Sequence, residues 1–390
     1  MKVCHICLTA GPYTDGFGYH ENLLPVYHKK LGLEVVRMIH AKKYIDGVGT
    51  VGEREIKNYV DKDGIYNVVI ERSKPVNLLI HKLYRFKNIY ENLERIKPDI
   101  LFVHGIQFSN VFDIIRYKKN HPYVRLYADH HGDYFIMPLN TWKRCFVQYC
   151  IYGYYARSVA KYTNVFWGVT PWREKYLHEV YKIKPEKTGV LFMGADDDLI
   201  HFNEQPVLRK NLREKWGLCE DDFVVISGGK VDLKKNIHLL VEAVAECKYE
   251  KIKLVFFGDI LEECKTILNN LISRYPDKIR FIGWLDAAEC YDYFLMADLA
   301  VFPGNHSVLW EQALATGIPT VFKHWEGMEH VDVGGNCCFL SEDTLEEIKT
   351  TITRIYEDRL LYHTMKINSV QKAVPAFSSY ECAKKSIGII

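Results

Sequence analysis

Apolar segments alternate with helical segments throughout the second half of the chain, and this alternation constrains the possible folds more than any other feature. The expected strands lie at residues 223–227, 253–259, 279–285, 297–302 and 319–323. The expected helices lie at residues 260–274, 286–296, 307–315 and 343–371. Strands that alternate with helices form a parallel sheet with helices on its faces. The second half is therefore expected to be an α/β domain.

The first half has a similar pattern. Expected strands lie at residues 2–9, 97–106, 123–135 and 164–172, and helical periodicity covers residues 78–97 and 139–162. A chain of 390 residues is long enough for two domains of ordinary size. We expect one domain at residues 1–195, completed by a C-terminal helix at 374–390, and a second domain at 196–373.

One loop of the second half has the features of an anion site. Residues 303–319, PGNHSVLWEQALATGIP, follow an apolar strand. The backbone N–H groups of Ser307, Val308 and Leu309 would open a helix and face a phosphate. Glu311 lies one turn further on, where a carboxylate can accept hydrogen bonds from ribose hydroxyls. The pattern favours a nucleoside diphosphate ligand, and an ordinary capped helix is the alternative interpretation.

Two lysines follow the first strand of the second half. This strand leads into a Gly-Gly turn, and Lys230 and Lys235 come next, before an amphipathic helix. Two cations beside one ligand can neutralise the charge that develops on a leaving diphosphate. We therefore predict that Lys230 and Lys235 contact phosphates, with Gly229 in the turn.

Polar residues also cluster where strands of the first half end. The third expected strand ends in Asp129, His130, His131 and Asp133, and the strand before it ends at His104. Parallel strands deliver functional groups at their C-terminal ends. Two histidines between two carboxylates can form a metal site or an oriented imidazole pair. We favour an imidazole at His131 that Asp129 or Asp133 orients, over a structural network or a metal site.

Segment 303–319 resembles the donor-binding signature of family 4 glycosyltransferases, which are retaining enzymes with the GT-B fold. The residues that match its second half are Glu311, Gln312, Ala313, Gly317 and Pro319. The first Glu of the signature is absent, because Pro303 occupies its position. The segment is similar to the shortened form found in bacterial surface-polysaccharide transferases of the capsule and O-antigen type. Asn305 and His306 are the nearest substitutes for the missing Glu.

This resemblance implies an α/β protein of two Rossmann-like domains, with parallel sheets facing across a cleft. It implies transfer of a hexose from a nucleotide-diphosphate donor, by default a UDP-sugar, to a lipid-linked or glycan acceptor in surface-polysaccharide assembly. Neither a cofactor nor a metal ion is expected. The alternatives are a GT-B nucleotide-sugar epimerase and a nucleic-acid-binding module that uses the basic first half.

The resemblance also implies roles for individual residues. The expected catalytic residues are His131, Lys230, Lys235 and Glu311. The expected donor-binding residues are Gly16, Gly18, Gly229, Lys230, Lys235, Gly283, Trp284, Leu285, His306, Ser307, Val308, Leu309 and Glu311. Gly16 and Gly18 would close over the donor phosphates, and residues 283–285 would contact the base through backbone groups.

Charge is distributed unevenly along the chain. Residues 1–195 contain 29 Lys and Arg against 18 Asp and Glu, whereas the remainder contains 22 against 31. A basic half favours an anionic partner. Residues 139–162 are aromatic-rich and include Lys143 and Arg144. We expect most of these aromatic side chains in the core and the basic fringe on an anionic membrane surface.

Several absences bear on the compartment. The eleven cysteines have no framework spacing, which suits a reducing compartment. The N-terminal segment is interpreted as a strand rather than a signal peptide, and the sequence has no apolar run of membrane-spanning length. We expect a cytoplasmic protein with peripheral contact to the inner face of the plasma membrane. The run Asp196 to Asp198 is interpreted as a domain hinge rather than a metal motif.

Overall fold

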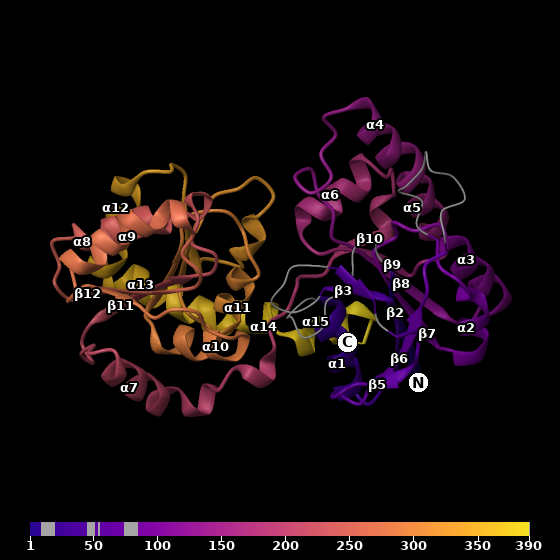
Figure 1. Cartoon of the computed structure of the whole chain (residues 1–390), viewed down its shortest axis with the longest axis horizontal. Coiled ribbons are helices and arrows are strands. Elements are labelled where there is room, and N and C mark those ends of the chain that lie inside the picture. Colours follow the sequence, from indigo (N-terminus) through magenta and orange to yellow (C-terminus); the bar gives the residue numbers. More distant parts are fainter. Residues whose placement is uncertain (9–19, 45–50, 54, 74–84, 390) are drawn as a thin grey trace. The chain divides into compact units, whose positions relative to one another are not determined.

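The chain forms two α/β units in a computed structural model that describes residues 1–8, 20–44, 51–53, 55–73 and 85–389 (Figure 1). The first unit comprises Met1–Met193 with Ser379–Ile390, and the second comprises Gly194–Ser378. The divisions thus lie beside the expected boundaries at residues 195 and 373. Among the described residues, no helix combines the length and the apolar character needed to cross a bilayer.

The first unit is built on an eight-stranded sheet with the order β10-β9-β8-β7-β1-β2-β6-β5. Its strands are β1 (Lys2–Cys7), β2 (Glu34–His40), β5 (Tyr59–Val60), β6 (Tyr66–Ile70), β7 (Ile100–His104), β8 (Arg125–His130), β9 (Val165–Gly168) and β10 (Thr188–Val190). All neighbours are parallel except β5 and β6. A separate antiparallel pair consists of β3 (Lys42–Tyr44) and β4 (Val51–Glu53).

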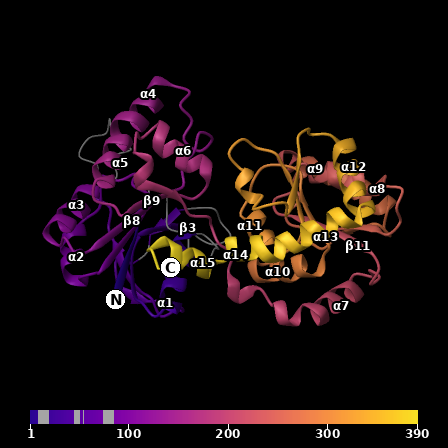
Figure 2. The same cartoon turned by 180° about the vertical axis from the view of Figure 1, so that it is seen from behind.

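Helices cover both faces of this sheet (Figures 1 and 2). They are α1 (His20–Lys30), α2 (Ile89–Ile96), α3 (Val111–Asn120), α4 (Trp142–Cys145), a π-helical segment (Phe146–Tyr152), α5 (Gly153–Ala160), α6 (Pro171–Glu179) and α15 (Ser379–Ser386). One core cluster contains Leu24 and Tyr27 of α1 together with Cys382 and Ala383 of α15. The last helix of the chain therefore completes the core of the first unit.

The second unit has a six-stranded parallel sheet with the order β13-β12-β11-β14-β15-β16. Its strands are β11 (Phe223–Gly228), β12 (Ile252–Phe257), β13 (Ile279–Phe281), β14 (Leu299–Phe302), β15 (Thr320–Lys323) and β16 (Cys337–Leu340). Its helices are α7 (Gln205–Lys215), α8 (Ile237–Ala245), α9 (Glu262–Arg274), α10 (Ala287–Met296), α11 (Leu309–Ala315), α12 (Leu345–Glu357), α13 (Arg359–Asn368) and α14 (Val374–Ala376). This strand order is that of the Rossmann fold.

Three expectations about elements are wrong. Strand β16 was not expected, and the single helix expected at 343–371 is divided at Asp358. Asp358 ends α12 and caps α13, because its carboxylate accepts a hydrogen bond from the backbone N–H of Leu361. The helix expected at 78–97 begins only at Ile89 in the described part of the chain, since Phe86 forms an antiparallel bridge with Arg72.

Candidate active site

The strand order of the second sheet places its ligand site between β11 and β14. The chain proceeds from β11 in one direction to β12 and β13, and in the other direction to β14, β15 and β16. In open α/β sheets, ligands bind at the carboxyl ends of the strands where the order reverses. The loops at these ends contain Lys230 and Lys235 after β11, and residues 303–308 after β14. The sheet therefore brings together two segments about 70 residues apart in sequence.

Lys235 is held against the loop that follows β14. Its Nζ donates hydrogen bonds to the carbonyl oxygens of Asn305 at 2.6 Å and His306 at 3.3 Å. Burial lowers the pKa of Lys235. Lys230, by contrast, is exposed and has no ion pair with another described residue. The two predicted cations thus lie near one strand end in different surroundings.

A small cavity opens beside Lys235. It is lined by Ser227, Gly228, Lys235, Ile237, Phe302, Pro303, Gly304, Asn305 and Ser307. The hydroxyl of Ser227 is fully buried and has no hydrogen-bond partner among the described residues. The backbone N–H groups of Ser307, Val308 and Leu309 also donate to no described residue. The unpaired groups of Ser227 and Ser307, which line the cavity beside Lys235, suit an anionic ligand.

Glu311, the carboxylate predicted to bind the ribose, already contacts two histidines through one of its oxygens. Glu311 is 1 % exposed, and its Oε1 lies 2.8 Å from Nε2 of His306 and 3.6 Å from Nε2 of His330. Burial would raise the pKa of Glu311, but the charge of His306 and hydrogen bonds from His306 and His330 outweigh it and lower the pKa to about 2. Oε2 has no hydrogen-bond partner among the described residues. Glu311 is thus an ionised carboxylate with one unpaired oxygen.

Backbone packing between the loops requires glycine. A Cβ on Gly258 would lie 1.8 Å from the carbonyl oxygen of Gly229, and a Cβ on Gly304 would lie 2.4 Å from backbone atoms of Lys234 and Lys235. The loops after β11, β12 and β14 therefore touch through their main chains. Such close approach leaves backbone groups available to a ligand.

The residues expected around the base follow β13. Gly283 has a φ of 80°, and its carbonyl oxygen accepts a hydrogen bond from the N–H of Gly258. Trp284 is exposed, whereas Leu285 is buried. Gly16 and Gly18, which were expected to close over the phosphates, lie outside the described residues.

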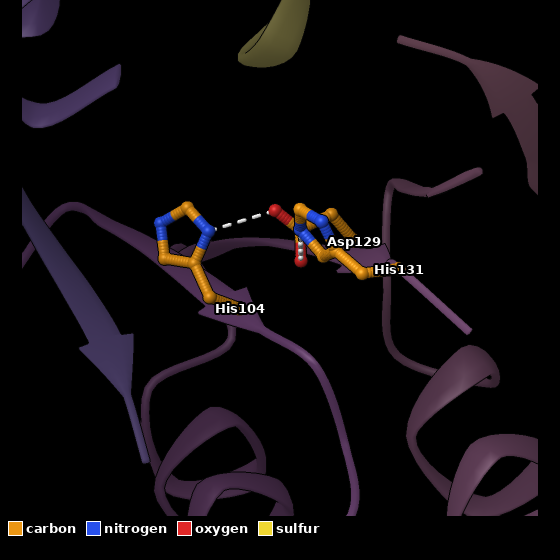
Figure 3. Close-up of side chains that lie close together, drawn as sticks. All are labelled: His104, Asp129 and His131. Atoms are coloured by element: carbon orange, nitrogen blue, oxygen red, sulfur yellow. Dashed lines mark hydrogen bonds and ion pairs between the residues drawn. The ribbon is translucent and has the colours of Figure 1, made fainter. Parts of the chain in front are cut away.

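A second cluster lies in the first unit, where β7 and β8 end. Nδ1 of His104 donates a hydrogen bond to Oδ2 of Asp129 at 2.7 Å, and Nε2 of His131 lies 3.2 Å from Oδ1 (Figure 3). One carboxylate therefore accepts a hydrogen bond from His104 and lies within ion-pair distance of His131, whose Nε2 makes no hydrogen bond with a described residue. Asp133 does not share this role, because its Oδ1 accepts from the N–H groups of Phe135 and Ile136.

Neighbouring charges shift the pKa values of Asp129 and His131 in opposite directions. Burial would raise the pKa of Asp129, but the charges of His104 and His131 and their hydrogen bonds hold it well below its usual range. Burial would lower the pKa of His131, but Asp129 raises it above the ordinary value. His130 packs against Tyr176 and Tyr181, and burial lowers its pKa to about 3. The pKa of His131, whose side chain is one third exposed, is thus raised whereas that of His130 is lowered.

The ligand atoms of His104, Asp129 and His131 all lie within 4.8 Å of one another, so the oriented imidazole and the metal site both stay predictions for this cluster. In the 2.7 Å contact Nδ1 of His104 carries a proton, because a carboxylate only accepts. The aspartate run of the second unit also has structural contacts. The carboxylate of Asp196 accepts from the N–H of Asp198, and the carboxylate of Asp197 accepts from the hydroxyl of Ser378.

Comparison with known proteins now identifies the second unit. Residues 209–372 match the family described as Glycosyl transferases group 1. The matched segment lies within the second unit and covers less than half of the chain. The alpha-monoglucosyldiacylglycerol synthase of Streptococcus pneumoniae is 28% identical over 151 residues, which cover 36% of this chain and 33% of the synthase. YtcC of Bacillus subtilis is 23% identical over 353 residues, which cover 84% of this chain and 78% of YtcC.

The fold is shared with solved structures. HepE of Anabaena, solved in complex with UDP, has a TM-score of 0.67 at 15% identity, covering 99% of this chain and 98% of HepE. The chain has the GT-B fold, with two Rossmann-like α/β domains. The predicted fold class and the predicted class of enzyme, a glycosyltransferase, are confirmed at this level. The alignment spans about a third of the pneumococcal synthase.

Two residues of the glycosyltransferase domain were missed in the sequence. His330 lies in the short 3-10 helix Glu329–Val331 and reaches Glu311 across 19 residues, and Ser227 occupies the end of β11. Neither belongs to a recognisable spacing. Ser227 could have been found from its position, because it lies at the end of β11, where the strand order reverses.

Proposed function

We propose that this chain is a retaining glycosyltransferase that moves a hexose from a UDP-sugar to a lipid-linked or glycan acceptor in bacterial surface-polysaccharide assembly. The observation that carries the proposal is the grouping of Lys235, Ser227 and Glu311 at the reversal point of the second sheet. Such a point in a Rossmann fold binds nucleotides. The complex of HepE with UDP supports uridine as the base.

The donor would be held by its charge and its ribose. Lys235 and Lys230, with the backbone N–H groups of residues 307–309, would neutralise the leaving diphosphate. Oε2 of Glu311 would accept a hydrogen bond from a ribose hydroxyl, because His306 and His330 already engage Oε1. We propose that neither a metal ion nor a cofactor takes part, since fixed cations and amides supply the same electrostatic stabilisation.

In the first domain, His131 would face the transferred sugar. Asp129 raises the pKa of His131, so its imidazole is charged and can donate a hydrogen bond to a sugar hydroxyl or to the diphosphate. Asp129 orients this imidazole through Oδ1. The proposed role is to position and stabilise, and no general base is assigned.

We propose that the acceptor is presented at an anionic membrane surface. The segment around α4 would contact this surface. Trp142 is 74 % exposed and Phe146 is 53 % exposed, with Lys143 and Arg144 exposed between them. Exposed aromatic side chains interleaved with cations are typical of segments that bind anionic lipid surfaces. One relative is named as the synthase of a glycolipid, which agrees with a lipid-linked acceptor.

A thermal-shift screen with UDP, GDP, ADP and their common sugar conjugates tests the donor site. A ligand that binds the folded state stabilises it by about 2.7 kcal/mol at a hundred times its dissociation constant. We expect UDP and one UDP-sugar to raise the melting temperature of the wild type and of the exposed control Glu342→Ala. The increase should be much smaller in Glu311→Ala. Folded protein that no nucleotide stabilises would contradict the proposal.

Acceptor dependence separates the proposed transferase from its rivals. A transferase releases UDP in proportion to glycosylated product, whereas an epimerase rearranges the UDP-sugar in the absence of an acceptor. A nucleic-acid-binding module would shift RNA or DNA at physiological salt. Rearrangement of the donor without acceptor would favour the epimerase.

A further inference from the structure

A third histidine lies beside Asp129, on helix α1 of the first unit. His20 begins α1, and its Nε2 lies 3.9 Å from Oδ2 of Asp129. The side chain is only 3 % exposed, and Nε2 has no hydrogen-bond partner among the described residues. Buried polar atoms in folded proteins are nearly always paired, so an unpaired nitrogen beside a carboxylate is suited to bind a ligand. No step of the proposed transfer uses His20.

Nε2 of His131 is in a similar situation on the other side of Asp129. It lies 3.2 Å from Oδ1, yet it is buried and makes no hydrogen bond with a described residue. An aligned N–H at this distance would form an ordinary hydrogen bond, so the ring nitrogen is directed past the oxygen. Two imidazole nitrogens thus approach the two oxygens of one carboxylate without a hydrogen bond to either.

Other donors hold the carboxylate of Asp129 in place. Nδ1 of His104 donates to Oδ2 at 2.7 Å, and the N–H of Gly105 donates to Oδ1 at 3.0 Å. Each carboxylate oxygen offers two lone pairs, so each retains one for a further ligand. Carboxylates that bind metal ions are commonly oriented by such outer hydrogen bonds. His104 therefore supports Asp129, and the nitrogens of His20 and His131 remain available.

The spacing of His20, Asp129 and His131 fits one metal ion. Ligand atoms about 2.0–2.1 Å from a tetrahedral zinc ion lie roughly 3.3 Å apart, and two imidazoles bound to it have centroids roughly 5–6 Å apart. Nε2 of His131 and Oδ1 of Asp129 are 3.2 Å apart, and the ring centroids of His20 and His131 are 5.9 Å apart. His20 would move slightly inward, since 3.9 Å from Oδ2 exceeds the ideal spacing.

The surrounding charges are compatible with a cation at this point. Glu21 of α1 favours positive charge at His131, and Arg173 of α6 disfavours it. Nε of Arg173 lies 3.3 Å from Oδ2 of Asp133, and this ion pair offsets the charge of the guanidinium. The buried carboxylate of Asp129 is then available to attract a metal ion.

We propose that His20, Asp129 and His131 bind a divalent transition-metal ion, for which zinc is the probe, and that the bound ion inhibits sugar transfer. Two imidazoles and one carboxylate with a fourth position open are a common ligand set for zinc. Binding displaces any proton from Nε2 of His131. The ion would thereby occupy the imidazole that is proposed to face the transferred sugar. Inhibition rests on the proposed function, whereas metal binding does not.

A second group of metal-ligating side chains lies in the second unit. Ligand atoms of Cys219, Asp221 and Asp222 lie within 4.8 Å of one another. Asp222 accepts a hydrogen bond from the N–H of Cys219, and Asp221 pairs with Lys251, so both carboxylates are already engaged. Exposed thiols can nevertheless bind zinc, and both Cys219 and Cys150 are exposed. A test of the histidine site therefore requires a variant that lacks these two thiols.

Isothermal titration calorimetry with zinc tests the site in the double variant Cys150→Ser, Cys219→Ser. We expect one zinc ion per chain with micromolar or tighter affinity, and no binding of Mg²⁺, which prefers oxygen ligands. In the same background, His20→Gln and His131→Gln should each weaken zinc binding at least about a hundredfold, because loss of an outer partner alone costs about ten- to a hundredfold.

His121 supplies the control for these substitutions. It pairs with Glu94 outside the cluster, so His121→Gln should bind zinc as tightly as the double variant. Folded protein that binds no zinc, or unchanged affinity in His20→Gln, would overturn the proposal.

X-ray absorption spectroscopy of the zinc-bound double variant identifies the ligands without a substitution at the site. The first coordination shell should contain nitrogen and oxygen, with two imidazoles from His20 and His131. Sulfur in this shell would overturn the proposal, because it would assign the ion to a cysteine. Three imidazoles would also overturn it, because His104 would then be a ligand instead of a support for Asp129.

Transfer assays test the effect of the ion on activity. In the double variant, saturating zinc should lower the initial rate at least about tenfold, since a hydrogen bond from the imidazole of His131 is lost, and EDTA should restore the rate. The rate of His20→Gln should be nearly the same with and without zinc, which excludes zinc bound to the donor as the cause. Full activity of the zinc-bound protein would overturn the inhibition. The calorimetric test needs no sugar donor, so the metal site and the proposed function fail separately.

Discussion

Lys230 and Lys235 follow the same strand but have different surroundings, so their roles can be separated by substitution. Lys235 donates to two carbonyl oxygens of the loop after β14, whereas Lys230 is exposed. We expect Lys235→Ala to reduce turnover at least about a hundredfold through lost stabilisation of the diphosphate. It should also lower the free energy of unfolding by about 1 kcal/mol, because the loop loses hydrogen bonds.

Lys230→Ala provides the matched comparison. Loss of the Lys230 side chain should raise the KM for the donor about tenfold, as expected for one charge-assisted hydrogen bond. The free energy of unfolding in urea should stay nearly unchanged. Steady-state kinetics and urea titration of both variants measure these outcomes. Normal turnover in Lys235→Ala, in folded protein, would exclude this lysine from the donor site.

At the level of single residues, the predictions for the donor site came from local signals in the sequence. Glu311 and Lys235 belong to short motifs at the ends of strands, and the fold brings the two motifs to one sheet edge. The buried histidines His5, His28 and His104, whose ring nitrogens contact one another, gave no such signal. His5 and His104 are 99 residues apart, and His28 and Ser386 are 358 residues apart. Their association depends on strand order and on the return of α15, which no spacing in the sequence encodes.

At the scale of elements, the alternation of strands and helices was sufficient to predict the second sheet. Its boundaries were less predictable, because Asp358 divides a stretch of continuous helical periodicity by capping a new helix. The aromatic residues at 139–162 were expected mainly in the core. That expectation is wrong for Trp142, Phe146, Tyr149 and Tyr154, which are exposed, although Tyr152 and Tyr155 are buried. Helical periodicity does not distinguish an aromatic stripe in the core from one on the surface.

The exposed segment at α4 leads to a prediction about membranes. Burying the side chains of Trp142 and Phe146 in a lipid interface is worth roughly 1.5–3 kcal/mol each. We therefore expect the double variant Trp142→Ser, Phe146→Ser to bind anionic phospholipid vesicles at least about tenfold more weakly than the wild type in a sedimentation assay. Leu360→Ser, which removes an exposed apolar side chain of the second unit, should bind normally. Equal binding by all three proteins would contradict contact through α4.

At the scale of the whole molecule, the chain crosses twice between its two units. The first unit is closed by α15, which follows the second unit in sequence. Cys382, Ala383 and Ile387 are buried in the core that contains α1, and the N–H of the Trp167 indole donates to the carbonyl oxygen of Ser386. The second unit has its own core and its own proposed donor site. Stability and nucleotide binding should therefore respond separately to changes in α15.

Ala383→Arg tests this separation. Ala383 is fully buried, so the substitution overpacks the core and buries an unpaired charge, which destabilises by several kcal/mol. We expect calorimetry to show an early transition for the first unit and a later one for the second. Limited proteolysis should cut within residues 1–193 first. UDP should still raise the later transition, because Lys230, Lys235 and Glu311, which are proposed to hold it, lie within residues 194–378. The exposed neighbour Lys384→Ala should behave like the wild type, and a single transition insensitive to UDP in Ala383→Arg would show that the units do not fold independently.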